Sequence, residues 1–104
     1  MLHIDTEYVI IKNMNFEWDE SKSIINKSKH GIDFCTAKDI FLDENRVEII
    51  APYPIENRFI NIGKLNGKLW TVIFTIRGDA IRIISARRSR KKEVKLYDEK
   101  KDYS

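Results

Sequence analysis

The sequence predicts an α+β domain: an antiparallel meander of three strands, packed by two N-terminal helices and followed by a basic C-terminal helix. Three runs between residues 58 and 86 are rich in Ile, Val, Phe, Trp and Thr, which is the composition of β-strands. Two short turn signals separate these runs. Upstream, two segments of helical pattern each follow an aspartate, and downstream the chain continues into a basic helical segment.

Length and composition exclude several classes of protein. The 104 residues suffice for one domain with a single core. No apolar run approaches the roughly 20 residues of a bilayer-spanning helix and no signal peptide is visible, so we expect a cytoplasmic protein without membrane association. Cys35, the lone cysteine, fits a reducing compartment, and we interpret it as a small buried or half-buried residue. Because CxxC and Cys/His spacings are absent, we predict no metal site and no cofactor.

The net charge of +3 conceals an asymmetry between the two halves of the chain. Residues 1–57 carry 6 Lys/Arg and 11 Asp/Glu, a net of −5, whereas residues 58–104 carry 13 Lys/Arg and 5 Asp/Glu, a net of +8. The basic half contains the predicted meander and the last helix. This distribution favours a polyanionic partner for that half, and the acidic half reads as a solvated surface.

The first predicted helix covers residues 20–30. Asp19 is a suitable N-cap, and Gly31 supplies the left-handed conformation in which many helices end. The only large apolar residues in this helix are Ile24 and Ile25. We therefore expect these two side chains to dock the helix onto the sheet.

A second helix is predicted over residues 34–42, with Asp33 as its N-cap. Its apolar side chains fall on one face: Phe34, Ala37, Ile40 and Phe41. Residues 46–50 then read as a strand. This strand ends at Pro52 and Pro54, because proline cannot donate to a β-ladder.

The meander is predicted over residues 58–65, 68–76 and 80–86, and its turns predict its register. If Asn66-Gly67 forms a two-residue type I′ turn, Arg58 lies opposite Thr75. If the second turn, at residues 78–79, also has two residues, Thr75 lies opposite Arg82. A three-residue turn at that position would move Arg82 to the other face.

The predicted register gathers two arginines in one cross-strand row, Arg58–Thr75–Arg82, beside a second row on the same face, Ile60–Ile73–Ile84. Two guanidinium groups flanking a threonine repel each other unless an anion lies between them, so the first row is a candidate phosphate site. The opposite face carries bulkier side chains that helices must cover: Phe59, Trp70, Val72, Phe74, Ile81 and Ile83.

The C-terminal helix is predicted to start after Ser89 as its N-cap, with Arg90 and Lys91-Lys92 in its first turn. Cations at that end oppose the helix dipole, at a cost of roughly 0.3–1 kcal/mol each. We therefore expect an anion to bind at this helix start. Val94 and Leu96 are expected to dock the helix, and Tyr97 reads as a core or edge residue.

Four stretches together resemble one protein family: MNFEWDESK (14–22), KHGIDF (29–34), RFINIG (58–63) and RGDAIRIISARRSRKKE (77–93). In this order they are similar to the BrnT toxins of type II toxin–antitoxin systems, within the RelE/ParE-like superfamily. The resemblance implies a RelE-like fold and a ribonuclease that arrests translation. It also implies a cognate BrnA-like ribbon-helix-helix antitoxin, whose dimer bridges two toxins in a heterotetramer.

Under this resemblance we expect metal-independent RNA cleavage by in-line attack of the 2′-OH. Arg58 and Arg82 are the predicted contacts to the scissile phosphate. His30 is the candidate acid/base because its ordinary pKa lies near neutrality, although a histidine at a helix end more often bonds backbone carbonyls. Further candidates for this role are Lys22, Glu17 and Tyr97. The predicted substrate-binding residues are Arg77, Arg87, Arg88, Arg90 and Lys22.

Two other function classes fit the same composition. A nucleic-acid-binding module would occupy its target without cutting it, and a protein-interaction domain would use the basic face to bind an acidic partner. A single-turnover cleavage assay separates these classes, because a binder shows salt-dependent affinity and yields no cut products.

Residues 14–104 are predicted to form the single toxin domain, because Met14 stands where members of the family usually begin. We interpret residues 1–13 as an N-terminal extension without a role in activity, and a misassigned translation start is one explanation for it. They read either as a weak strand around residues 8–11 or as an unstructured arm.

Overall fold

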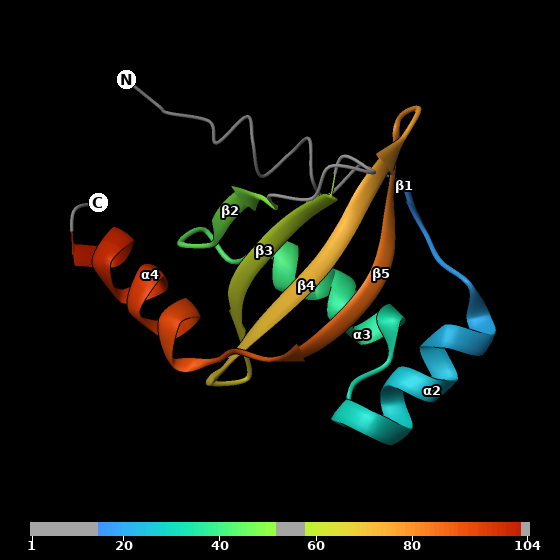
Figure 1. Cartoon of the computed structure of the whole chain (residues 1–104), viewed down its shortest axis with the longest axis horizontal. Coiled ribbons are helices and arrows are strands. Elements are labelled where there is room, and N and C mark those ends of the chain that lie inside the picture. Colours follow the sequence, from blue (N-terminus) through green and yellow to red (C-terminus); the bar gives the residue numbers. More distant parts are fainter. Residues whose placement is uncertain (1–14, 52–57, 103–104) are drawn as a thin grey trace.

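The computed structural model describes residues 15–51 and 58–102, and side-chain positions up to residue 100 (Figure 1). Three predicted features lie outside the described residues: the N-terminal extension, the weak strand within it, and the two prolines that follow the strand predicted at residues 46–50. Within the described residues, none of the helices combines the length and the apolar character needed to cross a membrane.

The fold is a mixed α+β arrangement around a five-stranded sheet of order β1-β5-β4-β3-β2. The strands are β1 (Asn15–Glu17), β2 (Val47–Ile50), β3 (Arg58–Leu65), β4 (Lys68–Arg77) and β5 (Ala80–Arg88). The helices are α2 (Glu20–His30), α3 (Phe34–Ala37), the 3-10 helix η1 (Lys38–Leu42) and the C-terminal α4 (Lys91–Asp102). The predicted meander is confirmed, since β3, β4 and β5 pair antiparallel in sequence order.

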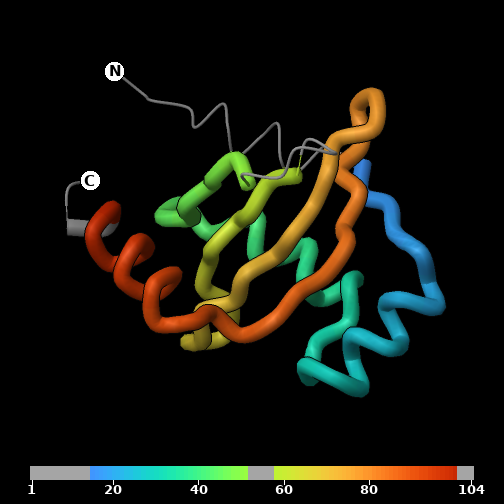
Figure 2. The backbone as a smooth tube through the Cα atoms, in the orientation of Figure 1, coloured from blue at the N-terminus to red at the C-terminus, as the bar shows by residue number. Residues whose placement is uncertain are grey.

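The β1 strand was not predicted. It pairs parallel with β5, so the sheet is not wholly antiparallel. Only three residues form it, and a parallel partner distant in sequence leaves no local turn signal to detect. Figure 2 shows how the chain leaves this short edge strand directly into α2, beside β5.

Helix α2 has the predicted ends. Asp19 accepts hydrogen bonds from the backbone of Ser21 and Lys22, and Gly31 adopts φ 80° at the C-terminal end. The predicted anchors, however, are wrong: Ile24 is 64% exposed and Ile25 57% exposed. Polar side chains are buried in their place.

The buried anchor of α2 is Asn26. Its amide nitrogen donates to the carbonyls of Ile32 and Ala86, both at 2.8 Å, and its carbonyl oxygen accepts the backbone N–H of Ala86 at 3.2 Å. One turn earlier, the hydroxyl of Ser23 accepts the backbone N–H of Phe34 at 2.9 Å. Hydrogen bonds between its polar side chains and backbone groups of β5 and of the segment after the helix therefore fix α2. Loss of such a side chain would leave buried main-chain groups without a partner, which is costly.

The segment predicted as a second helix is divided into α3 and the tighter η1. Asp33 caps it as predicted, accepting the backbone N–H of Thr36 at 2.8 Å, and the predicted apolar face is fully buried. Cys35 is exposed, which corrects its predicted burial. Close packing explains the position of Gly63 in β3, since a Cβ there would lie 2.7 Å from the side chain of Ile40 and 2.8 Å from its carbonyl oxygen.

The two faces of the sheet are covered differently. Helices α3 and η1 lie behind the sheet in Figure 1 and cover one face, with Val72, Phe74, Ile81, Ile83 and Ala86 in a common core. Alternation places Arg58, Thr75 and Arg82 on the opposite face. There, α4 packs near β2 and β3 at one end, and Tyr97 is buried as predicted whereas Leu96 is 41% exposed.

The anchoring of α2 yields a test of stability. We expect Asn26→Ala to lower the free energy of unfolding by about 2–4 kcal/mol, because it removes bonds to three buried main-chain groups. Ile24→Ala, on the same helix, is the matched control and should change stability by less than about 0.5 kcal/mol. Urea denaturation measures both, and equal effects of the two substitutions would contradict the assigned anchor.

Candidate functional site

A row of polar side chains crosses four strands on the face opposite the core. Arg58 lies opposite Thr75 and Thr75 opposite Arg82, which confirms the predicted register. The turn at Asn66-Gly67 has positive φ at both residues, as a type I′ turn requires. The unpredicted strand β1 extends the row by placing Glu17 opposite Arg82.

Arg82 and Glu17 form an ion pair, with 2.8 Å between Nη1 of the arginine and Oε2 of the glutamate. The side chains are 28% and 39% exposed, so solvent reaches the pair. Arg82, which the sequence predicted as a contact to phosphate, therefore already has a carboxylate partner within the chain. A guanidinium has five N–H donors, and only Nη1 of the Arg82 guanidinium donates a hydrogen bond to another of the described residues. The other N–H donors of Arg82 can therefore still bind a ligand.

The second predicted row is wrong at Ile84. A β-bulge shifts the register of β4 and β5, so that Ile73 lies opposite Ser85. The extra residue on β5 is Ile84. A bulge bends its strand and redirects the neighbouring side chains, and here it places Ser85 on the face that carries Arg82.

A pocket of about 200 Å³ opens between α2 and this bulged part of β5. Two residues predicted from sequence, Lys22 and His30, line it together. The sequence-based argument did not single out Lys29 and Ser85, which also line it. Spacing could have found Lys29, because residues 22 and 29 lie two turns apart on one face of a helix. The bulge that presents Ser85 carries no glycine or other local signal.

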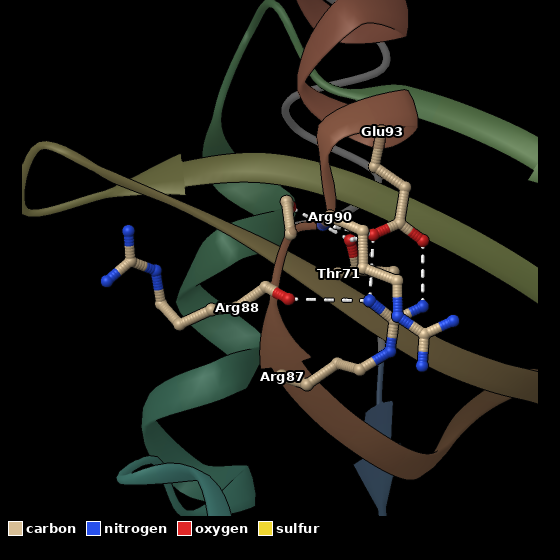
Figure 3. A network of polar contacts seen from close by, with 6 residues as sticks. Thr71, Arg87, Arg88, Arg90 and Glu93 are labelled. Carbon is tan, nitrogen blue, oxygen red and sulfur yellow. Dashed lines mark hydrogen bonds and ion pairs between the residues drawn. The ribbon is translucent and has the colours of Figure 1, made fainter.

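The start of α4 holds a second polar cluster (Figure 3). Ser89 is not the N-cap: the helix starts at Lys91, and the hydroxyl of Ser89 lies 2.9 Å from that of Thr71. The carboxylate of Glu93 reaches back and accepts the backbone N–H of Arg90 at 2.7 Å. It also accepts the hydroxyl of Thr71 at 3.0 Å. This arrangement is half of a capping box.

Arg87 completes the cluster with two hydrogen bonds of 2.7 Å, one to each carboxylate oxygen of Glu93. Burial disfavours the ionised carboxyl, but the bonds from Arg87, Arg90 and Thr71 outweigh it and hold the pKa of Glu93 below its usual value. Thus the anion expected at this helix start is the chain's own Glu93. Arg87, predicted to contact substrate, binds this carboxylate.

The other predicted cations are dispersed. Arg88 lies over the ring of Trp70, with 5.5 Å to its centroid, and its Nε donates to the carbonyl of Leu69. Arg77 is exposed at the end of β4, beside the turn to β5, and Arg90 is exposed at the start of α4. The other sequence-predicted residues fall into three groups, which are the cross-strand row, the α2–β5 pocket and the α4 start, and Arg77 and Arg88 lie outside them.

Tyr97 and Asp43 fix α4 on the sheet. The phenol donates to Asp43 Oδ2 at 2.7 Å, and the same oxygen accepts the backbone N–H of Lys64 at 2.8 Å. Burial and then this hydrogen bond raise the pKa of Tyr97 above its ordinary value. A phenol so bound is a poor proton-transfer group at neutral pH, which favours a structural role for Tyr97.

Comparison with known proteins gives one family. The model of the family described as "Ribonuclease toxin, BrnT, of type II toxin-antitoxin system" matches residues 18–93, which is more than half of the chain. No curated protein sequence matches the chain.

The carboxylate at the α4 start yields a prediction about pH. Because the folded pKa of Glu93 is lowered, its contribution to stability is present above the ordinary glutamate pKa and is lost as the pH falls through the folded value. We expect Glu93→Gln to cost about 1–3 kcal/mol at pH 7.

This cost should shrink as the pH is lowered through about 4. Denaturation at a series of pH values measures it. Glu99→Gln is the control, since Glu99 is exposed and its distance to Lys95 is 4.0 Å. A cost for Glu93→Gln that is the same at pH 3 and pH 7 would contradict the assignment.

Proposed function

This chain belongs to the BrnT family of ribonuclease toxins of type II toxin–antitoxin systems, and we propose that it is an endoribonuclease that cuts RNA without a metal ion. The observation that carries the proposal is the row Glu17–Arg82–Thr75–Arg58 on the sheet face opposite the core. An α+β fold with a central sheet and a C-terminal helix also fits the RelE/ParE-like superfamily, which we propose for this chain.

RNA carries its own nucleophile, so the protein needs to supply position and charge. In the proposed reaction the 2′-oxygen attacks phosphorus, the bond from phosphorus to the 5′-oxygen breaks, and a cyclic phosphate and a 5′-hydroxyl result. Negative charge grows on the phosphate oxygens during this step. Arg58 and Arg82 would bind those oxygens, because guanidinium groups match the geometry of phosphate.

Glu17 acts in this proposal as a positioning residue. Its carboxylate accepts a hydrogen bond from Nη1 of Arg82 and so fixes the rotamer of this arginine. The remaining N–H donors of Arg82 are therefore already oriented when RNA binds. An unrestrained arginine would lose about 2 kcal/mol of rotamer entropy on binding. The pair also supports strand β1, which is only three residues long.

His30 is the proposed proton-transfer group. One group must accept the 2′-OH proton and one must return a proton to the 5′-oxygen, and imidazole can do either near neutral pH. Its pocket includes Ser85, three positions beyond Arg82 on β5. Because of the bulge at Ile84, this separation matches the two positions from Thr75 to Ile73 on β4, or about 7 Å, which two side chains reaching from opposite sides can span.

We also propose an antitoxin partner resembling BrnA, a ribbon-helix-helix repressor whose dimer bridges two toxin molecules in the cytoplasm. Large apolar side chains exposed on the described surface support a protein partner: Ile24, Ile25, Ile50 and Ile76. Among the described strands, β2 lies at the outer edge of the sheet, where an extended segment could pair with it.

The clearest test of the reaction is Arg82→Ala. We expect the single-turnover rate of RNA cleavage to fall by about 10²- to 10³-fold, because a donor to the developing phosphate charge is lost. Cleavage products resolved on a denaturing gel, with enzyme in excess over RNA, give this rate. Lys68→Ala, which removes an exposed cation at the β3–β4 turn, is the control and should cut at the wild-type rate.

Two further measurements make the result decisive. Arg82→Lys keeps the charge and the ion pair but loses the planar fork, so an intermediate rate is expected. Thermal melting checks that each variant is folded. A folded Arg82→Ala protein that cuts at the wild-type rate would refute the assignment, and a wild-type protein that binds RNA without cutting it would indicate the non-catalytic binding module.

A further inference from the structure

We propose that the pocket between α2 and β5 is a second phosphate site for RNA, in which Lys29 and Ser85 bind the phosphate next to the scissile one. This inference rests on the proposed function and extends it to residues that neither the sequence nor the family match assigns. It also gives the bound strand a direction, from the cross-strand row towards α2.

The charge of the pocket is its first indication. Lys22 and Lys29 lie on one face of α2, and His30 adjoins them. Among the described residues, no carboxylate forms an ion pair with any of these three side chains. Two carboxylates lie close to Lys22 in sequence and neither lines the pocket: Glu20 accepts the indole N–H of Trp18, and Asp19 caps the same helix. A hydrogen bond from Ser21 and, to a smaller extent, the charge of Lys22 lower the pKa of Asp19.

This absence contrasts with three arginines elsewhere in the described chain. Arg82 pairs with Glu17, Arg87 with Glu93 and Arg46 with Glu48. Cations held around one small cavity repel each other unless an anion joins them. The pocket therefore differs from these three sites, because no ion pair joins a carboxylate to its cations among the described residues.

The walls of the pocket are fixed rather than loose. Asn26 bonds the backbone of β5 at Ala86, and this holds α2 at a set distance from the strand. Immediately before Ala86, the bulge on β5 places Ile84 and Ser85 at the pocket. Because a helix and a bulged strand define the cavity, its polar groups are oriented before a ligand binds.

The chemistry of the lining selects the ligand. Lysine ammonium groups donate hydrogen bonds only, and a serine hydroxyl can donate one. Such a set suits a ligand rich in acceptors and negative charge, which describes a phosphodiester. Ile25 and Ile84 supply an apolar side to the same cavity, suited to a sugar or a base edge. A volume of about 200 Å³ is smaller than the roughly 300–1,000 Å³ of drug-sized sites, so we infer that one nucleotide fills it.

The pocket also continues the cross-strand row. Register places Ser85 on the same face of β5 as Arg82 and about 7 Å further along the sheet, because these two residues lie opposite Thr75 and Ile73 on β4. A single RNA chain that crosses the row at Arg82 can therefore place its next phosphate near Lys29. His30 lies at the same pocket, which is consistent with proton transfer on this side of the scissile bond.

Binding should be measured with the full chain and a short mixed-sequence RNA whose 2′ positions are O-methylated, so that the nucleophile is blocked. Affinity is determined over a range of salt concentrations. We expect Lys29→Ala to reduce the slope of log affinity against log salt by about 0.7, which is one phosphate contact to a single strand. Ser85→Ala should weaken binding by about threefold to tenfold and leave the slope unchanged, because it removes a neutral hydrogen bond.

The matched control is Lys27→Ala. Lys27 lies on the same helix and carries the same charge, but it does not line the pocket, and its ammonium group is 3.5 Å from the carbonyl of Gly31. We expect its slope and affinity to remain at wild-type values. Equal slopes for Lys27→Ala and Lys29→Ala would overturn the proposal, since a general positive potential around α2 would then explain both.

Cleavage of unmodified RNA separates this proposal from the function on which it rests. If wild-type protein cuts RNA and Arg82→Ala does not, but Lys29→Ala binds as wild type does, the second site is refuted and the ribonuclease assignment stands. If wild-type protein does not cut RNA, the ribonuclease assignment fails, and the phosphate-site proposal built on it fails with it.

Discussion

The candidate site depends on one buried amide. Asn26 bonds the backbone of β5 on one side and the carbonyl of Ile32 on the other, so it joins α2, the following loop and the sheet. Strand β1 pairs with β5 only as far as Arg82, and beyond that point helix α2 lies beside the strand instead. Without the amide, neither the pocket nor its position relative to the cross-strand row would be defined, because the apolar residues of α2 face solvent.

The uneven distribution of charge along the chain has a structural reason. The acidic half supplies partners to the basic half: Glu17 from β1 pairs with Arg82, and Asp43 receives Tyr97 and the backbone of Lys64. A basic sequence segment is thus a poor measure of free positive charge, since long-range pairing neutralises part of it. What remains for an anionic ligand depends on which cations the fold leaves without carboxylates, and only the structure shows this.

The sequence predicted the fold correctly where a single short motif determines the local structure. Asn66-Gly67 specifies a two-residue turn, and alternation then fixes the row that contains Arg58 and Arg82. The bulge at Ile84 could not be predicted, because no residue near it favours a bulge. The same limit applies to α2, where apolarity pointed to Ile24 and the geometry of hydrogen bonding selected Asn26. At α4, Ser89 is followed three residues later by Lys92 and not by a glutamate, so the sequence lacked the capping-box signature, and Glu93 caps the helix from a position three residues after Arg90.

The sheet face that carries Arg82 has a carboxylate bound to its cations at the α4 end and none paired with them among the described residues at the α2 end. This difference bears on the direction in which the proposed substrate would extend. At the α4 end, Arg87, the hydroxyl of Thr71 and the backbone N–H of Arg90 surround a carboxylate, which is the arrangement a phosphate would otherwise receive. A ligand could bind there only by displacing Glu93, whose lowered pKa shows how strongly the charged form is held. At the α2 end, cations of similar strength surround a cavity with no carboxylate paired to them among the described residues. An anionic chain bound at Arg82 therefore gains more by extending towards α2 than towards α4, and the internal carboxylate is what makes the two directions unequal.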